Sequence, residues 1–433
     1  MKKYVVVGTG GRSGMYISAL TEQFTESCDL VALCDRNVGR ARLYQQNIRE
    51  STGREVAVYT DDQFDRMIDE QKPDRVVVTT GPDRTHAEYI VRSMRAGCDV
   101  VTEKPMTTNA ELAREILAAR DETGRELQVT FNYRYSPPRA QVRRMIAEGS
   151  IGDVLSVDFA WHLDTRHGAD YFRRWHRRRE NSGSLLVHKS THHFDLVNWW
   201  IDDVPAEVFA QGTLKYYTPE HAEELGLGAH GERCADCPVS SKCPFFLDLA
   251  GNEKLKEMYL EQEEHDGYYR DRCVFSDEID IWDTMSVTVK YESGALLSYL
   301  LHAYSPVEGY RIAFNGTKGR IEHFASENTY VSGDGTTPGE LEKGKVGTTL
   351  IPEFSKPQVI EPETGEGGHG GGDPMLLRDV FTPGDPDPLR RRANQVDGSY
   401  SILIGVAAGL SIDRGAPVRI SELLGDAPLG ERW

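Results

Sequence analysis

The first 35 residues carry the pattern that most restricts the fold. A short apolar run, Tyr4 to Val7, leads into the glycine turn Gly8-Thr9-Gly10-Gly11-Arg12-Ser13-Gly14. A helical pattern follows, and a second apolar run ends at Asp35. This order of strand, glycine turn, helix, strand and acid is typical of a dinucleotide-binding unit, although Ser13 replaces the third glycine of the usual motif. It predicts a Rossmann domain.

Each part of this unit has an expected role toward a dinucleotide. Gly8 permits the tight turn, Gly10 lets the backbone approach a pyrophosphate, and the N–H groups that follow would face the anion. Asp35 would accept hydrogen bonds from ribose hydroxyls and would repel a 2′-phosphate. NAD is therefore favoured over NADP, although Arg36 and Arg40 leave NADP open.

Strand and helix patterns alternate up to about residue 130. We expect strands at 76–80, 99–102 and 127–131, with helices between them. Such alternation indicates a parallel sheet, whose ligands lie beyond the carboxyl ends of the strands. Because Glu103-Lys104 and Asn132 follow two of these strands, they are expected at the ligand edge.

From about residue 151 the pattern changes to longer strands. These are expected at 153–162, 206–216, 284–303, 310–325 and 417–420, while 330–375 is rich in Gly, Pro and Thr and is expected to be loop. The predicted fold is α/β: a Rossmann domain with a doubly wound parallel sheet at 1–130, then an α+β domain with an open, mostly antiparallel sheet at 131–433. The uncovered face of an open sheet favours a homodimer or homotetramer.

Composition excludes two classes of partner. The formal net charge of −18 argues against nucleic acid, which needs clustered Lys and Arg. No apolar run approaches the ~20 residues of a membrane span, and the first strand starts too close to Met1 for a signal peptide. We therefore expect a soluble, cytoplasmic protein. Two short basic runs, 173–179 and 390–392, are candidate interface or anion sites, although a solvated face is favoured for the second.

The cysteines fall into two groups. Cys28, Cys34 and Cys98 lie in apolar patterns and are expected in a core. An insertion at about 215–275 has no clear core pattern and contains four thiols, at Cys234, Cys237, Cys243 and Cys273. The C-x2-C-x5-C spacing suits a closed tetrahedral site, so a structural zinc is predicted; an iron–sulfur cluster, a disulfide or unrelated thiols are alternatives.

The segment from His188 to Asp195 concentrates ionisable groups beside apolar residues. It reads His-Lys-Ser-Thr-His-His-Phe-Asp, and on a helix His188, His192 and Asp195 share one face. Such clusters are typical of active sites, where pKa values are shifted, although a surface helix carries histidines too. His188 and His192 are also spaced as metal ligands, but no third ligand is identifiable.

Six motifs follow one another along nearly the whole chain: the glycine turn with Asp35, Thr80 to His86, Glu103-Lys104-Pro105, Asn132-Tyr133-Arg134-Tyr135, the segment around His192, and Gly316-Thr317-Lys318-Gly319. In this order they resemble the glucose–fructose oxidoreductase, inositol dehydrogenase and rhizopine-catabolism (Gfo/Idh/MocA) family. The resemblance implies binding of NAD(P) and oxidation or reduction of sugars, cyclitols or related alcohols. The segment before His192 departs from the family pattern: Ser182-Gly183-Ser184 replaces a run of glycines, Ser190 replaces a later glycine, and His188 stands where the family has an aspartate. The cysteine insertion also lies outside the common pattern.

The glycine turn and the resemblance together predict the coenzyme contacts. These are Gly8, Gly10, Gly11, Arg12, Ser13, Asp35, Arg36, Thr80, His86, Glu103, Lys104 and Asn132.

The expected chemistry is removal of a hydroxyl proton while a hydride leaves the same carbon for nicotinamide. Histidine suits the base because its pKa lies near neutral pH, and His192 is the predicted base. Lys104 would donate to the same oxygen. His188 would orient His192, relay the proton or bind a substrate hydroxyl.

Further residues are candidate substrate contacts. Arg166, Tyr171 and Trp175 offer hydroxyl partners and a stacking surface, and Lys189 and His193 flank the predicted base. Asp195 would fix the tautomer of a neighbouring imidazole. The glycine-rich segment 368–373 is either a flexible turn or a loop that brings His369 and Asp373 to the cleft.

Three functions fit these patterns. The first is an NAD-dependent dehydrogenase acting on a sugar, glycoside or cyclitol. The second is a glycosidase that holds NAD tightly, oxidises a sugar at C3 transiently, eliminates the aglycone and re-reduces the product; the extra histidines favour it, because elimination needs a second acid/base. The third is a non-catalytic regulator that senses a dinucleotide, against which the presence of both Lys104 and His192 argues.

Overall fold

The computed structural model describes residues 1–327, 340–382 and 384–432. Within them, the first sheet has six parallel strands in the order β3-β2-β1-β4-β5-β6, which is the strand order of a Rossmann domain. Its strands are β1 (Lys2–Val7), β2 (Cys28–Cys34), β3 (Ala57–Tyr59), β4 (Arg75–Val78), β5 (Asp99–Thr102) and β6 (Leu127–Val129). The predicted fold of the N-terminal part is confirmed.

Local sequence signals start and stop the helices around this sheet. Those helices are α1 (Gly14–Ser18), α2 (Val38–Thr52), α3 (Phe64–Gln71), α4 (His86–Arg95) and α5 (Ala110–Thr123). The side chain of Asn37 accepts a hydrogen bond from the backbone of Arg40 at the start of α2, and Asn109 caps α5 in the same way. Both helices end at a left-handed glycine, Gly53 and Gly124.

A helix from the C-terminal part covers one face of the Rossmann sheet. This is α14 (Gly368–Phe381), whose Leu376 and Val380 are buried in the same apolar cluster as Val6. The ring centroid of Phe381 lies 5.3 Å from that of Tyr4. The domain boundary at residue 130 stays a prediction, and the chain beyond it contributes to both sheets' cores.

The second sheet has nine strands in the described residues, in the order β14-β13-β12-β11-β7-β10-β9-β8-β15. Only β7 and β10 pair in parallel, so the sheet is mostly antiparallel, as predicted. The strands are β7 (Val154–Asp164), β8 (Pro205–Thr213), β9 (Thr284–Tyr291), β10 (Leu296–Ser305), β11 (Gly309–Gly316), β12 (Gly319–Glu327), β13 (Leu341–Pro352), β14 (Gln358–Ile360) and β15 (Val418–Arg419).

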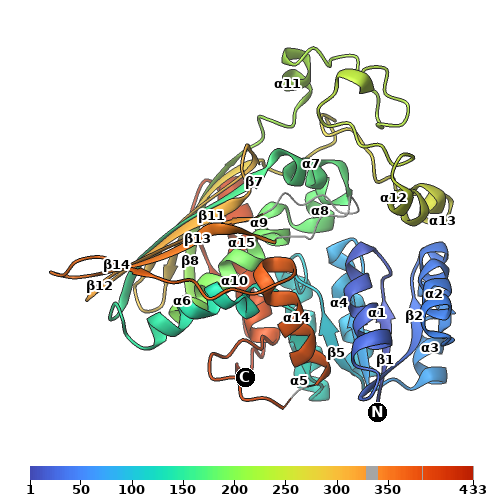
Figure 1. Ribbon diagram of the computed structural model, residues 1–433, viewed down its shortest axis with the longest axis horizontal. Helices are drawn as coiled ribbons and strands as arrows, with labels where there is room; N and C mark the ends of the chain where they lie inside the picture. Colours follow the sequence, from blue (N-terminus) through green and yellow to red (C-terminus); the bar gives the residue numbers. More distant parts are fainter. Residues whose placement is uncertain (328–339, 383, 433) are drawn as a thin grey trace.

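Helices lie on one face of this sheet (Figure 1), and they include α6 (Pro137–Ala147), α9 (Leu185–His188), α10 (Ser190–Ile201) and α15 (Gln395–Arg414). Shorter helices complete this part: α7 (Thr165–Arg173), α8 (Arg179–Ser182) and α16 (Ile420–Leu424). Buried and exposed side chains alternate along β9 and β10, so one face of each strand packs against the helices and the other is open.

The expectation of loop over 330–375 is wrong for much of that segment. It contains β13, β14 and the start of α14, while 328–339 lie outside the described residues. β13 pairs with β12 from Gly319↔Pro352 to Ala325↔Val346. The neighbouring strand supplies the backbone hydrogen bonds, so a segment with Gly and Thr becomes a strand without a strong propensity of its own.

The insertion at 215–275 rises beside the second sheet and returns over the Rossmann domain (Figure 1). It contains α11 (Pro219–Glu224), α12 (Glu253–Met258) and α13 (Glu263–Asp266). The basic run 173–179 holds it, because Arg173 donates to the carbonyl oxygen of Phe245 at 3.0 Å and Arg177 to that of Cys273 at 3.4 Å. This run is therefore an interface within the chain.

The second basic run, 390–392, is also ion-paired. Arg390 pairs with Asp202, and Arg392 donates to Asp379 at 2.9 Å. Cys28, Cys34 and Cys98 are buried, as predicted. No helix of the described residues is long and apolar enough to cross a membrane.

Candidate active site

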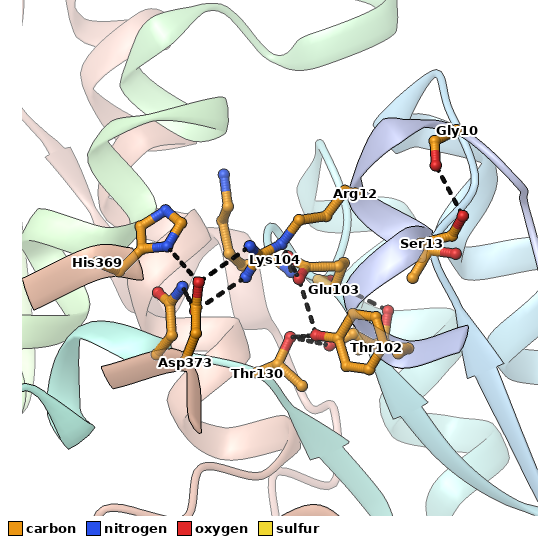
Figure 2. A network of polar contacts seen from close by, with 12 residues as sticks. Gly10, Arg12, Ser13, Thr102, Glu103, Lys104, Thr130, His369 and Asp373 are labelled. Carbon is orange, nitrogen blue, oxygen red and sulfur yellow. Dashed lines mark hydrogen bonds and ion pairs between the residues drawn. The ribbon is translucent and has the colours of Figure 1, made fainter. Parts of the chain in front are cut away.

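Lys104 stands at the carboxyl edge of the Rossmann sheet, just after β5 (Figure 2). Its Nζ lies 3.4 Å from the backbone carbonyl oxygen of His188, so it bridges from the Rossmann domain to the helices of the second domain. Burial lowers the pKa of Lys104 to about 8, against the opposing effect of the carboxylates of Glu103 and Asp83. A lysine with this pKa can exchange its proton near neutral pH.

A network of carboxylates and cations extends from Arg12 of the glycine turn to His369 of α14 (Figure 2). The Nε of Arg12 donates to Glu103 at 2.7 Å, and its other nitrogens face Asp373 at 3.4 Å or more. Asp373 also accepts from the side-chain nitrogen of Asn132 at 2.7 Å and pairs with His369 at 2.9 Å. The glycine-rich segment that begins α14 therefore brings His369 and Asp373 to the predicted coenzyme residues.

The glycine turn has the shape that a dinucleotide requires. Gly8 has φ of +92°, and a Cβ there would lie 2.5 Å from the backbone nitrogen of Thr80. A Cβ at Gly10 would meet no atom within 4 Å, so the backbone there borders open space. The hydroxyl of Ser13 donates to the carbonyl oxygen of Gly10 at 2.7 Å, and Gly11 begins the helical turn that follows. These features fit the approach of a pyrophosphate to bare backbone.

Asp35 lies where the ribose is expected, at the end of β2. Its carboxylate accepts from the backbone and hydroxyl of Thr9 and from the backbone of Asn37. A carboxylate has about four lone-pair sites, so acceptor capacity remains for a ribose hydroxyl. Arg36 is exposed, and Arg40 lies 3.7 Å from the Asp35 carboxylate.

His86 joins the two loops that flank Lys104. Its Nδ1 lies 2.8 Å from the carbonyl oxygen of Pro105, and its Nε2 lies 2.8 Å from that of Thr80. Burial lowers the pKa of His86. A neutral imidazole carries one N–H, so it donates to one of these two carbonyl oxygens at a time and links the segment after β4 to the segment after Lys104.

His192 is a buried histidine on α10. Its ring stacks on Tyr133 with centroids 4.4 Å apart. Burial lowers the pKa of His192 well below its ordinary value, and the positive charges of Lys104 and Lys189 lower it further. Among the described residues, no hydrogen-bond partner is found for His192 Nδ1 or for the buried Oδ1 of Asn132. Two such atoms in one site fit a polar ligand.

Asp83 is a site residue that the sequence reasoning missed. It follows β4, and its Oδ2 lies 2.5 Å from Nδ1 of His188, so the pair joins the two domains. Burial raises the pKa of Asp83 and lowers that of His188, which favours one shared proton and no net charge. The resemblance leads us to expect an aspartate at position 188, where this chain has histidine. Asp83 of the Rossmann domain supplies a carboxylate beside that histidine. Asp83 lies within the Thr80 to His86 motif, which was its only signal.

Two of the predicted substrate residues lie beside His188. The ring of Tyr171 is 5.3 Å from that of His188, and its hydroxyl lies 2.8 Å from Nε2 of His167. The ring of Trp175 stacks on His176 at 3.6 Å and meets His188 edge-on at 5.8 Å. Both aromatic rings therefore pack around His188.

The other predicted substrate residues have different surroundings. Lys189 is buried, with its Nζ 3.4 Å from the Tyr133 hydroxyl. The ring of His193 stacks on Trp161 at 4.0 Å, within the aromatic core of the second sheet, and Arg166 is exposed on α7. Their role in substrate binding stays a prediction.

The hypothesis that Asp195 fixes an imidazole tautomer is wrong. Both of its oxygens accept from the guanidinium of Arg134, at 2.8 and 2.6 Å, and both side chains are buried. A guanidinium matches a carboxylate with two parallel hydrogen bonds, so the arginine after β6 outcompetes a histidine for this acid.

The predicted zinc site is not supported. Cys234, Cys237, Cys243 and Cys273 do line one cavity of about 20 Å³, and three backbone N–H groups donate to their sulfurs at 3.4–3.5 Å. Across the described ranges, however, no three His, Cys, Asp or Glu side chains are arranged to hold a metal ion, which applies to His188 and His192 as well. Ion pairs of Arg233 with Glu263 and Asp271 hold the insertion instead.

Comparison with known proteins agrees with the geometry. Residues 2–131 match the model of the oxidoreductase family's NAD-binding Rossmann fold, and 143–420 match that of its C-terminal alpha/beta domain. The chain is 40% identical to the protein named oxidoreductase YteT of Bacillus subtilis (strain 168), over 98% of this chain and 99% of that one. It is 31% identical to an inositol 2-dehydrogenase of Rubrobacter xylanophilus, over 48% of this chain and 54% of that one.

A solved structure shares the fold. It is the aldose-aldose oxidoreductase from Caulobacter crescentus complexed with glycerol, with a TM-score of 0.62 and 17% identity, covering 96% of this chain and 99% of that one. Both domain models match in order, and together they span most of the sequence. The chain therefore belongs to the Gfo/Idh/MocA family of oxidoreductases.

Proposed function

We propose that this protein is an NAD-dependent oxidoreductase that transfers a hydride between a secondary hydroxyl of a sugar, glycoside or cyclitol and the coenzyme. The observation that carries the proposal is the position of Lys104. Its Nζ lies 3.4 Å from the carbonyl oxygen of His188, just before the helix that carries His192, and the preceding Glu103 binds Arg12 of the glycine turn. An inositol 2-dehydrogenase among the relatives supports a polyol substrate.

In the proposed reaction His192 and Lys104 act on the same substrate oxygen. NAD held at the glycine turn and Asp35 would supply the acceptor for the hydride that leaves the carbon. His192 takes the hydroxyl proton on a ring nitrogen. Its lowered pKa keeps the ring neutral before the reaction but makes it a weaker base than a free histidine, so the proton transfer depends on Lys104 stabilising the oxygen. Lys104 donates a hydrogen bond to the same oxygen and stabilises the negative charge that develops there. Tyr171 and Trp175 offer a surface on which a sugar ring would stack.

The experiment that tests the proposal needs the coenzyme content of the purified protein first. Its absorbance and a heat-released extract assayed for NAD give that content. The protein is then incubated with NAD and with free sugars, methyl glycosides and inositols, and absorbance is followed at 340 nm. Growth of NADH with one class supports a dehydrogenase. NAD binding without any reaction would move the assignment to a dinucleotide sensor.

The glycosidase function is the second candidate, and the Asp83–His188 pair favours it. Oxidation at C3 acidifies the neighbouring C–H, and elimination then needs a base for that proton and an acid for the leaving oxygen. A buried pair that shares one proton would serve as a second acid/base beside His192. Release of nitrophenol from nitrophenyl glycosides without net NADH formation would support this candidate over the first.

We further propose that the open face of the second sheet is a homodimer or homotetramer interface. Leu296, Leu300 and Phe324 are 47%, 38% and 43% exposed there, and the face carries a hollow of about 610 Å³. Exposed apolar side chains on a sheet face are typical of subunit contacts. Light scattering after size exclusion should give two or four chains for the natural protein and fewer for Leu300→Glu. A single chain in the natural protein would contradict this.

A further inference from the structure

The tip of the cysteine-rich insertion, residues 253–268, lies on the coenzyme side of the Rossmann domain (Figure 1). It consists of α12, the turn Leu260–Gln262, α13 and the two residues after it. Leu255, Met258 and Tyr259 form an apolar cluster that packs against Leu43 and Tyr44 of α2. The insertion tip is therefore docked on the domain by a core of its own.

Tyr259 contacts the glycine turn directly. Its hydroxyl accepts a hydrogen bond from the backbone N–H of Gly11 at 3.2 Å, and the residue is 6% exposed. That N–H is one of the donors that the glycine turn would present to a pyrophosphate. A tyrosine hydroxyl that accepts from Gly11 still has its own proton to donate to a phosphate oxygen. The space beside Gly10 remains open for that oxygen.

A second contact of the insertion tip involves Arg40, the basic side chain that could otherwise bind the 2′-phosphate of NADP. Arg40 donates to Asp266 of the insertion tip at 2.5 Å and lies 3.7 Å from Asp35. The side chains of Arg40 and Asp266 are 11% and 10% exposed, so water screens the pair little. The side-chain nitrogen of Asn37 also donates to the carbonyl oxygen of Gln262 at 2.8 Å. A 2′-phosphate here would lie near the carboxylates of Asp35 and Asp266, and Arg40 would already be paired with Asp266.

The insertion tip is also tied to the second domain. Tyr268 accepts from Nε of Arg174 at 3.0 Å, and Arg174 pairs with Asp170 of α7 at 3.3 Å. Arg233, near the cysteines, binds Glu263 of α13. The tip therefore joins the coenzyme side of the Rossmann domain to the helix that carries Tyr171.

We propose that the insertion tip is a coenzyme-binding element. Tyr259 completes the pyrophosphate site, Asp266 makes the site reject NADP by engaging Arg40, and the docked tip slows the release of bound NAD. The inference rests on the proposed function, because it requires a dinucleotide at the glycine turn. It assigns part of the coenzyme preference to residues outside the Rossmann domain.

Calorimetric titration of the full-length protein with NAD and NADP tests this proposal without any substrate. Tyr259→Phe keeps the ring in its cluster and removes one hydrogen bond to a charged group, so we expect the Kd of NAD to rise about ten-fold. Asp266→Asn frees Arg40, so the ratio of the NADP to the NAD Kd should fall about ten-fold. Glu264→Gln, on the same helix with an 82% exposed side chain, is the matched control and should change neither value.

Further measurements separate the possible failures. The gain for NADP in Asp266→Asn should vanish when Arg40→Met is added, and displacement of NAD followed by stopped flow should be faster in Tyr259→Phe. Unchanged or tighter NAD binding in Tyr259→Phe, or an unchanged Kd ratio in Asp266→Asn, would overturn the inference. Should Asp266→Asn fail to fold, Tyr259→Phe alone decides. Failure of the natural protein to bind either dinucleotide would instead overturn the proposed function.

Discussion

The protonation of Lys104 should set the upper limit of the active pH range. Burial lowers its pKa from 10.5 to about 8, which corresponds to about 3 kcal/mol of lost preference for the charged form. The charged form is the one that donates to the developing alkoxide. For oxidation, kcat/KM should therefore fall above pH 8. It should also fall at acid pH as His192 becomes protonated, but only below 6.5, the ordinary histidine pKa, because the pKa of His192 is lowered.

Two substitutions at this position give opposite results. Lys104→Arg keeps a cation that does not lose its proton in this range, so the fall above pH 8 should disappear even where the overall rate is lower. Lys104→Met removes the donor, and loss of one such group costs about 10²- to 10³-fold in kcat. NAD affinity, measured by titration, should change little in either variant.

The assay follows NADH at 340 nm from pH 5.5 to 9.5, with the sugar or cyclitol that gives the highest rate and at several substrate concentrations. Above pH 8 the stability of the fold should rise while the activity falls. The buried charge destabilises the fold below pH 8, and this cost is relieved as the pH rises from 8 toward 10.5. A falling limb that persists unchanged in Lys104→Arg would refute the assignment of that limb to Lys104.

Three further predictions concern the glycine turn and two buried ion pairs. Gly8→Ala should abolish NAD binding and lower Tm, because the new Cβ meets backbone at a φ of +92°; unchanged binding in a titration would contradict the tight turn. Asp83→Asn should lower kcat about 10- to 100-fold with NAD affinity unchanged, since it removes the carboxylate that shares a proton with His188, and equal kcat would remove the pair from the mechanism. Arg134→Met should destabilise the protein by about 3–5 kcal/mol in denaturant unfolding, because Asp195 is left buried without its partner; a change below 1 kcal/mol would contradict the buried pair.

The Rossmann domain was predictable because its signals are local. The glycine turn and the apolar runs on either side of it each act within a few residues. When strand and helix units of this kind repeat, the Rossmann strand order is the expected arrangement. The same logic placed Lys104 and Glu103 at the ligand edge, where the structure has them.

The pairings between distant segments were not predictable from one sequence. Asp83 joins His188 across 105 positions, Asp373 joins Arg12 across 361, and Tyr259 joins Gly11 across 248. The residues next to an aspartate or tyrosine in the sequence do not indicate which distant group its side chain will contact. β13 was missed for the same reason, because its partner strand decides its structure.

The cysteines illustrate a limit of motif spacing. The spacing of Cys234, Cys237 and Cys243 correctly indicated thiols gathered in space, and Cys273 joins them at one cavity. Spacing alone does not determine the distances between the sulfur atoms, and a metal-ligand arrangement is not found in the part of the chain that the structure describes.

The most direct test of the proposed chemistry compares His192→Asn and Lys104→Met with the natural protein in single turnovers. Each protein is saturated with NAD, mixed with the same sugar or cyclitol, and followed at 340 nm, after NAD affinity has been measured by titration. We expect both variants to bind NAD with nearly unchanged Kd and to lose at least 100-fold in the rate of NADH formation. Turnover at the natural rate in either variant would contradict the roles given to this pair.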